Sequence, residues 1–311
     1  MTLFLNTTLA GLELGLVYAV AALGMYIAYS VLDFPDLTAD GSFPLGGVVS
    51  TILLYRAGMP PLPALLLAAL AGAACGALTG VLHARFRITP LLSGIIVMTA
   101  LLSVTLGLTT FLSPTGNTLV NFSYIVYDVR GLFNPAGAAL APWALILVLL
   151  LAVVIVKLLL DLFFRTRVGY LLIATGDNPR LVTSLGRHPG AYKILGLALA
   201  NGLVALGGAL YAGMRMQYDN TSGSGMVVLT LASVIIGTVL FSRARFVRPT
   251  TATIIGALIY ALCLNYFVLL DPNGIYLKIM NAAAFACILI VYGRAADRRK
   301  KGGVHHGGNN A

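Results

Sequence analysis

Long apolar runs alternate with short polar connections along this chain, and the pattern predicts its architecture. About 20 consecutive apolar residues span a bilayer as one helix. We therefore predict an all-α polytopic membrane protein with about nine membrane segments. These segments cover about Thr8–Val31, Phe43–Leu54, Pro63–Leu82, Pro90–Leu112, Trp143–Phe164, Ala191–Met214, Met226–Phe241, Thr250–Leu270 and Leu277–Tyr292.

The second of these segments is unusually short. It follows the stretch DFPDLTADGSFPLGG, residues 33–47, in which aspartates, prolines and glycines interrupt any helix. A short apolar segment entered through a Gly/Pro break is typical of a discontinuous membrane helix. We predict such a helix here.

The break also carries candidate pathway residues. Irregular backbone at membrane depth is tolerated only inside protein or along a watery cavity. Asp40, Ser42 and Phe43 are therefore candidates to line a translocation path near mid-membrane. The alternative is a cytoplasmic turn with solvated carboxylates. The cost of a carboxylate in hydrocarbon favours solvation for at least Asp33 and Asp36.

Small and amide residues within the spans suggest how the helices pack. Gly72, Gly76 and Gly80 recur at every fourth position and give the third segment a flat face for close packing. Asn201 and Asn265 are lone amides in apolar spans, which either face the path or hydrogen-bond between helices.

The sequence that follows the break has a short, weak match later in the chain. GSFPLGGVV, starting at Gly41, and GSGMVVLTL, starting at Gly223, each follow a polar break and open a short span. Equivalent half-helices of two repeats would show this pattern.

The longest polar connection that contains a helix signal runs from Arg165 to Lys193. Within it, Asp177 can cap a helix N-terminus, Pro179 suits the first turn, and Gly186 suits the C-terminal stop. We predict a short helix outside the bilayer that a second protein binds. The alternative is a solvated loop that merely connects two spans.

Positive charge predicts the orientation. With the C-terminus inside and nine alternating spans, sixteen of the 20 Lys and Arg residues fall inside. The others, outside, are Arg56, Arg130, Arg215 and Lys278. This sidedness is typical of an inner membrane protein, and it places the connection 165–193 in the cytoplasm. Lys157 and Asp161, one turn apart near the end of the fifth span, can form an ion pair.

Composition excludes several classes of function. The chain is 59% hydrophobic with a mean hydropathy of +0.93, and its net charge of +10 gathers in short basic turns. That distribution indicates membrane sidedness and argues against nucleic-acid binding. The sequence contains no GxxxxGK[ST], HExxH or GxSxG motif and no cysteine spacing typical of a metal site. We therefore expect neither an enzyme nor a metal protein.

Three stretches of the sequence match a known family. They are DLTADGSFPLG from Asp36, ITPLLSGIIVMT from Ile88, and ATGDNPRLVTSLG from Ala174, the last followed by the span from Leu195 to Ala212. With these stretches the chain resembles the permease subunits of bacterial ABC importers in the branched-chain amino acid and ribose permease superfamily. Within that superfamily it is similar to the tryptophan/tyrosine permease group.

The resemblance implies a type II importer permease that works with other proteins. The expected partners are an ABC ATPase, which binds ATP and Mg, an extracytoplasmic solute-binding protein, and a second permease copy in a homodimer. The solute would be a small organic molecule such as an amino acid, aromatic if the resemblance extends to the subgroup. The short cytoplasmic helix would couple the ATPase to transport through Asp177, Asn178, Pro179, Arg180, Leu185 and Gly186.

A stand-alone secondary transporter or channel is the alternative from another class. It would need intramembrane ionisable groups for coupling ions. The third, fourth and sixth to ninth segments contain no Asp or Glu, although carbonyls and hydroxyls could bind Na⁺. Whether the chain is an importer subunit or a stand-alone transporter, we expect residues 1–301 to form one transmembrane domain in contact with lipid. We expect residues 302–311 to form a flexible polar tail.

Overall fold

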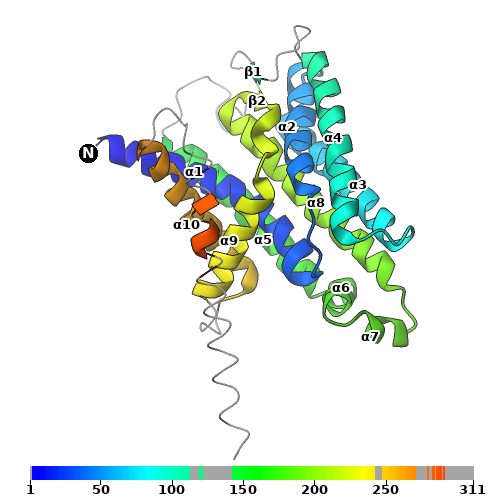
Figure 1. The fold of residues 1–311 in the computed structure, drawn as a ribbon. Coiled ribbons are helices and arrows are strands. Elements are labelled where there is room, and N and C mark those ends of the chain that lie inside the picture. The colour runs from blue at the N-terminus through cyan, green and yellow to red at the C-terminus, as the bar shows by residue number, and fades with distance from the viewer. Residues whose placement is uncertain are drawn as a thin grey trace, which may run out of the picture.

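The computed structural model describes residues 2–112, 119–121, 142–241 and 247–270, together with isolated positions between 279 and 290. Its elements are almost all helical (Figure 1). The α-helices are α1 (Thr2–Met25), α2 (Ala39–Tyr55), α3 (Pro61–Ala84), α4 (Pro90–Leu112), α5 (Pro142–Phe164), α6 (Arg167–Asp177), α7 (Pro179–Ser184), α8 (Pro189–Arg215), α9 (Met226–Leu240) and α10 (Pro249–Leu270). A π-helix, η1 (Tyr26–Val31), extends α1, and a 3-10 helix, η2 (Asn220–Gly223), precedes α9.

The described helices confirm a multi-pass membrane protein. Seven segments are long and apolar enough to cross a bilayer: 4–31, 61–84, 90–112, 145–164, 189–215, 220–240 and 249–269. Helix α2 has 17 residues and is about 25 Å long, which is less than the hydrocarbon thickness of roughly 30 Å. The predicted ninth span, 277–292, and the predicted tail, 302–311, lie largely or wholly outside the described residues.

One short sheet departs from the all-α prediction. Strands β1 (Leu119–Asn121) and β2 (Gln217–Asp219) pair antiparallel, with Val120 opposite Tyr218. They tie the connection after α4 to the turn after α8. Three-residue strands in two polar connections carry no detectable alternation, so the sequence could not predict them.

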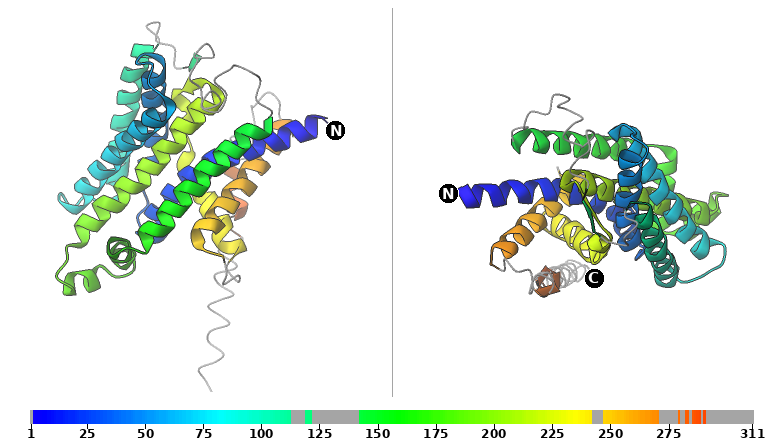
Figure 2. Two further views of the ribbon diagram at one scale, coloured as in Figure 1. Left: turned by 180° about the vertical axis from the view of Figure 1, so that it is seen from behind. Right: turned by 90° about the horizontal axis from the view of Figure 1, so that it is seen from above.

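The helices form an inner and an outer group. The segments of α1, α8 and α9 are 78%, 61% and 56% buried, whereas those of α3, α4, α5 and α10 are at most 33% buried. Figure 2 shows α8 beside α3 on one flank and α1 beside α5 on the other. The exposed leucines of the outer helices, such as Leu66, Leu70, Leu158 and Leu162, give the chain an apolar surface suited to lipid.

The predicted glycine face of α3 packs against α8. A Cβ on Gly76 would collide with the carbonyl group of Leu197, and one on Gly80 would approach the Cα of Ile194 to 2.7 Å. Side chains larger than hydrogen would push the two backbones apart. This contact confirms the interpretation of the Gly72–Gly80 spacing.

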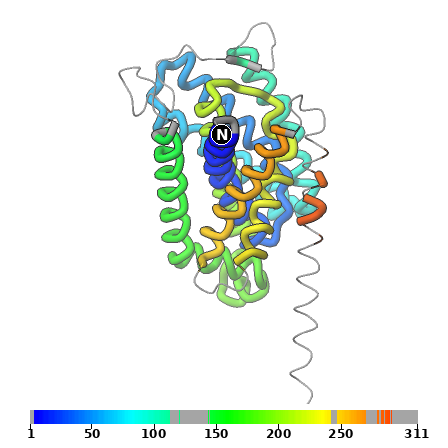
Figure 3. The backbone as a smooth tube through the Cα atoms, turned by 90° about the vertical axis from the view of Figure 1, so that its left-hand side faces the viewer, coloured from blue at the N-terminus to red at the C-terminus, as the bar shows by residue number. Residues whose placement is uncertain are grey.

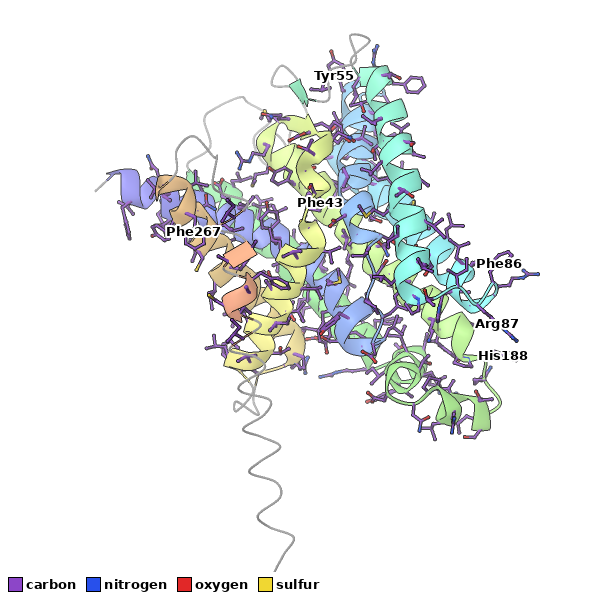
Figure 4. All side chains as sticks on the ribbon, viewed as in Figure 1. Phe43, Tyr55, Phe86, Arg87, His188 and Phe267 are labelled. Atoms are coloured by element: carbon purple, nitrogen blue, oxygen red, sulfur yellow. The ribbon has the colours of Figure 1, made fainter. Side chains whose placement is uncertain are left out.

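The two ends of the molecule differ in character. The β1–β2 pair lies at one end and α6 and α7 lie at the other (Figures 1 and 3). In Figure 4, Arg87 and His188 lie at the α6–α7 end, while Tyr55 lies at the opposite end. The α6–α7 end carries Arg87, Arg167, Arg180 and Arg187, and we name it the basic end.

Candidate functional site

The predicted break lies between α1 and α2. The first helix widens into the π-helix η1, and Leu32 caps its end with a backbone N–H that donates to the carbonyl of Ile27. Asp33 then adopts a left-handed conformation with φ of 51°, and α2 begins at Ala39 rather than at Phe43. Helix α2 continues without interruption through Pro44, so the irregular backbone is confined to residues 32–38.

A buried polar network anchors this break to the bundle. Asp36 is only 2% exposed. One carboxylate oxygen accepts a hydrogen bond from the backbone N–H of Thr38 at 2.9 Å, and the other accepts one from Asn201 Nδ2 at 2.6 Å. The amide oxygen of Asn201 in turn accepts a bond from the Ser42 hydroxyl at 2.8 Å. Asn201 thus joins α8 to α2 and to the break, which confirms the interhelical role considered for it.

The expectation that Asp36 is solvated is wrong, although Asp33 is indeed exposed. Burial raises the pKa of the Asp36 carboxyl, and hydrogen bonds from Thr38 and Asn201 oppose that rise. Among the described residues, no ion pair involves Asp36. Neutral donors therefore replace water around this carboxyl, as a buried polar group requires.

Asp40 links the start of α2 to the start of α9. Its carboxylate accepts hydrogen bonds from the backbone N–H groups of Val227 at 2.7 Å and Gly225 at 3.4 Å. Because Pro44 has no N–H, the carbonyl of Asp40 lacks its helical donor. A Cβ on Gly223 would collide with this carbonyl.

The two stretches matched in the sequence therefore meet in space, at the N-termini of two short segments. Their equivalence as repeats remains a prediction. An acidic side chain at a helix N-terminus is favourable, because the exposed N–H groups there carry partial positive charge.

Phe43 belongs to an aromatic cluster near mid-height in the molecule (Figure 4). It is fully buried, and its ring centroid lies 5.7 Å from that of Tyr211 and 6.4 Å from that of Tyr18. The guanidinium of Arg215 lies 5.7 Å from the centre of the Tyr211 ring. Phe43 was a candidate from the sequence alone, whereas its partners come from α1 and α8, far from it in the chain.

Asn265 does not join the other candidate pathway residues. Its amide donates a hydrogen bond to the carbonyl of Ala261, one turn earlier on α10, at 3.1 Å. Its Cβ faces Gly11 of α1. Asn201 and Asn265, which looked alike in the sequence, therefore have different surroundings.

The predicted polar connection contains two helices instead of one. Helix α6 was not predicted. It follows the N-cap Thr166, whose side-chain hydroxyl accepts a hydrogen bond from the N–H of Gly169 at 3.2 Å. Its buried residues, Gly169, Leu172 and Thr175, follow a three-residue spacing that could have revealed it.

Asn178, not Asp177, caps the short helix α7. Its side-chain oxygen accepts hydrogen bonds from the backbone N–H groups of Arg180 at 3.1 Å and Leu181 at 3.4 Å. Asp177 is the last residue of α6. Pro179 explains the choice, because a proline disfavours helical geometry in the residue before it, and Asn178 is extended. Gly186 has a φ of 71°, which supports its prediction as the stop.

Helix α7 buries one side chain against the rest of the protein and exposes all the others. Val182 is fully buried, whereas every other residue from Asp177 to His188 is exposed. The exposed residues include two leucines, Leu181 at 51% and Leu185 at 60%. A fixed helix that presents apolar side chains outside the membrane-spanning segments offers a surface for another protein.

Helix α6 connects α7 to the break. A Cβ on Gly176 would collide with the carbonyl oxygen of Val31, the last residue of η1. On the other side, Gly196 of α8 lies against the side chains of Leu32 and Leu172. The backbone of α6 therefore rests directly on the π-helix, and the exposed surface of α7 is one rigid element away from the Asp36 network.

Among the described residues, no group of three or more His, Cys, Asp or Glu side chains could hold a metal ion.

Comparison with known proteins identifies the family of this chain. The family described as "Branched-chain amino acid transport system / permease component" matches residues 7–291. No solved structure matches the chain significantly.

Three curated relatives each cover most of the chain. A tyrosine transport system permease protein of Clostridioides difficile (strain R20291) is 39% identical over 274 residues, covering 88% of this chain and 87% of the relative. An uncharacterised protein of Rickettsia prowazekii (strain Madrid E) is 29% identical, covering 89% and 94%. The ribose import permease protein RbsC of Escherichia coli (strain K12) is 26% identical, covering 88% and 82%. The chain belongs to the branched-chain amino acid transport permease family, whose members are membrane components of ABC transporters.

Proposed function

We propose that this chain forms the membrane pathway of an ATP-driven importer for an amino acid, with an aromatic amino acid such as tyrosine as its first candidate. As an ABC permease component the chain is not itself an enzyme, and its family works in the bacterial inner membrane with an ATPase and a solute-binding protein. The observation that carries the proposal is the match over residues 7–291. The tyrosine permease, 39% identical, supports the solute class. Family membership decides against a stand-alone secondary transporter or channel.

The α6–α7 segment, within residues 165–193, is proposed to couple this chain to its ATPase. Asp177, Asn178, Pro179 and Arg180 are exposed around the start of α7, and Leu185 and Gly186 are exposed at its end. The partner ATPase, which would bind ATP and Mg, would hold these residues. Its closure would then move α6 against η1, where Gly176 meets Val31.

The solute path is proposed to pass the meeting point of α2 and α9. Asp40, Ser42 and Phe43 are the side chains placed closest to it, with Asn201 behind them. Ser42, Phe43 and Asn201 are buried in this structure, so α2 and α9 would have to separate for the solute to reach them. Asn265 would line the path only along α10, away from this group.

We further propose nine membrane segments, with the second entered through the break at 32–38 and the ninth near 277–292. Residues 1–301 would form one domain with the C-terminus and the tail 302–311 in the cytoplasm. Two copies of the chain would pair in the membrane as a homodimer.

Reconstitution tests the function directly. The chain is incorporated into liposomes with an ABC ATPase and a solute-binding protein from the same organism, and uptake of radiolabelled tyrosine, leucine and ribose is compared. We expect ATP-dependent uptake of an amino acid and none with an ATPase that lacks its P-loop lysine. Uptake of ribose alone would contradict the proposed solute class.

Changing Gly186 to Arg is expected to uncouple ATP hydrolysis from transport. No atom lies within 4 Å of a Cβ at this position, so the bulky cation can be accommodated in this chain but would obstruct the docked partner. Gly186→Asn is the matched control, because Asn tolerates the left-handed backbone that both variants must adopt. The measurement is uptake per ATP hydrolysed. Equal coupling in the Arg and Asn variants would argue against docking at this position.

A cysteine at Ser42 is expected to react with a membrane-permeant thiol reagent during turnover but not at rest. The Ser42 side chain is fully buried here, so reaction requires α2 to move away from Asn201. The variant is made in a chain whose Cys75, Cys263 and Cys287 are replaced by Ala. Labelling that is equally absent with and without ATP would contradict a path at this position.

A further inference from the structure

A cavity of about 320 Å³ opens between η1, α5, α6 and α10. Its polar lining comes from Asp161, Arg165, Arg248 and Thr250, and its apolar lining includes Tyr26 and Ile173. The pathway and coupling roles proposed above use none of its polar residues. We call it the Arg165–Arg248 cavity.

The cavity carries net positive charge. Asp161 accepts bonds from Lys157 Nζ at 3.0 Å, Arg248 Nη1 at 2.8 Å and the Thr250 hydroxyl at 2.8 Å. The predicted Lys157–Asp161 pair is thereby confirmed. The charged residues that line the cavity are Arg165, Arg248 and Asp161, which give it a formal charge of +1. Lys157 does not line the cavity, but its ion pair with Asp161 further neutralises that carboxylate. Arg165 forms no ion pair within the described part of the chain.

The two arginines lie where a bilayer would place its phosphates. Arg165 directly follows the span that ends at Phe164, and Arg248 directly precedes the span that begins at Pro249. Each guanidinium therefore sits at the junction between hydrocarbon and water. Beside the cavity, α5 exposes Leu158 and Leu162, which are 57% and 63% accessible, and these offer an apolar track for an acyl chain.

We propose that the Arg165–Arg248 cavity binds the phosphate of an anionic phospholipid from the leaflet at the basic end. Guanidinium groups bind phosphate oxygens with paired, charge-assisted hydrogen bonds, and basic pockets between membrane helices at this height suit lipid headgroups. The acyl chains run along α5. The bound headgroup touches both η1 and α6, through Tyr26 and Ile173, and so contacts the joint between the coupling segment and the break.

Native mass spectrometry of the purified full chain tests the proposal, with phosphatidylglycerol and phosphatidylcholine as probes. Wild-type protein retains phosphatidylglycerol in preference to phosphatidylcholine. Arg165→Gln weakens phosphatidylglycerol binding about tenfold, the effect of losing one charge-assisted bond. Arg85→Gln is the matched control, because Arg85 is exposed at the end of α3 and outside the cavity. The Arg165 variant is the primary one, since Arg248 also pairs with Asp161.

Three results would overturn the proposal. The first is equal binding of the two lipids by the wild-type chain. The second is unchanged phosphatidylglycerol binding in Arg165→Gln protein that melts at the wild-type temperature. The third is displacement of the lipid by an equal concentration of inorganic phosphate, which would identify a site for a free anion.

Discussion

Replacing Gly176 by Leu is expected to abolish coupled uptake while the protein still inserts into the membrane. The backbone of α6 touches η1 at this point, because even a Cβ would collide with the carbonyl oxygen of Val31. Leucine must therefore push α6 away from the π-helix. Overpacking of this kind costs about 1–3 kcal/mol of stability, so the protein should still fold while the close contact between α6 and η1 opens.

Gly107→Leu is the matched control for this experiment. Gly107 is also a helical glycine, on α4, but no atom lies within 4 Å of its Cβ position. The measurement is solute-stimulated ATPase activity and uptake in liposomes, with thermal melting to check the fold. Normal uptake by the Gly176→Leu protein would show that α6 does not transmit motion to the break.

Asn201→Leu is expected to destabilise the protein by about 3 kcal/mol, the cost of leaving a buried charged or polar group without its partner. The change removes the donor to Asp36 and the acceptor of the Ser42 hydroxyl in one step. The measurement is thermal unfolding in detergent. The melting temperature should fall by several degrees, as a loss of this size implies.

Two further variants make this prediction specific. Asn265→Leu also replaces an asparagine within an apolar span. In the described contacts, however, the Asn265 amide hydrogen-bonds only to its own helix. The Asn265→Leu protein should therefore melt near the wild-type temperature. Adding Asp36→Asn to Asn201→Leu should recover part of the loss, because an orphaned amide is less costly to bury than a carboxylate. A melting temperature for Asn201→Leu equal to that of Asn265→Leu would refute the network's structural role.

Much of the fold follows from local patterns in the sequence. Apolar runs predict the spans because bilayer thickness fixes the helix length. The glycine spacing of α3 predicts a close packing face, and Gly186 marks the end of α7 because few residues accept a positive φ. Asn178 could have been identified as the cap as well, since Pro179 disfavours helical geometry at the preceding position.

The parts that the sequence could not predict depend on partners distant in the chain. Asp36 was expected to be solvated because a carboxylate in hydrocarbon is costly, yet it is buried against an amide partner that lies 165 residues away in the sequence. Arg248 lies 87 residues from Asp161. The contact between Gly176 and Val31 is between backbones and leaves no pattern in side-chain chemistry. Long-range hydrogen bonds of this kind arise from tertiary packing, which no local periodicity records.

Photo-crosslinking from α7 tests the central claim most directly. A benzoylphenylalanine is placed at Leu181 on the basic end or at Tyr55 on the opposite end, both of which are about half exposed, and the membranes are irradiated with the ABC ATPases of the same organism present. We expect a covalent adduct between an ATPase and the Leu181 variant, in higher yield with ATP, and none with the Tyr55 variant. Adducts at Tyr55 but not at Leu181 would contradict both the orientation and the coupling role of this segment.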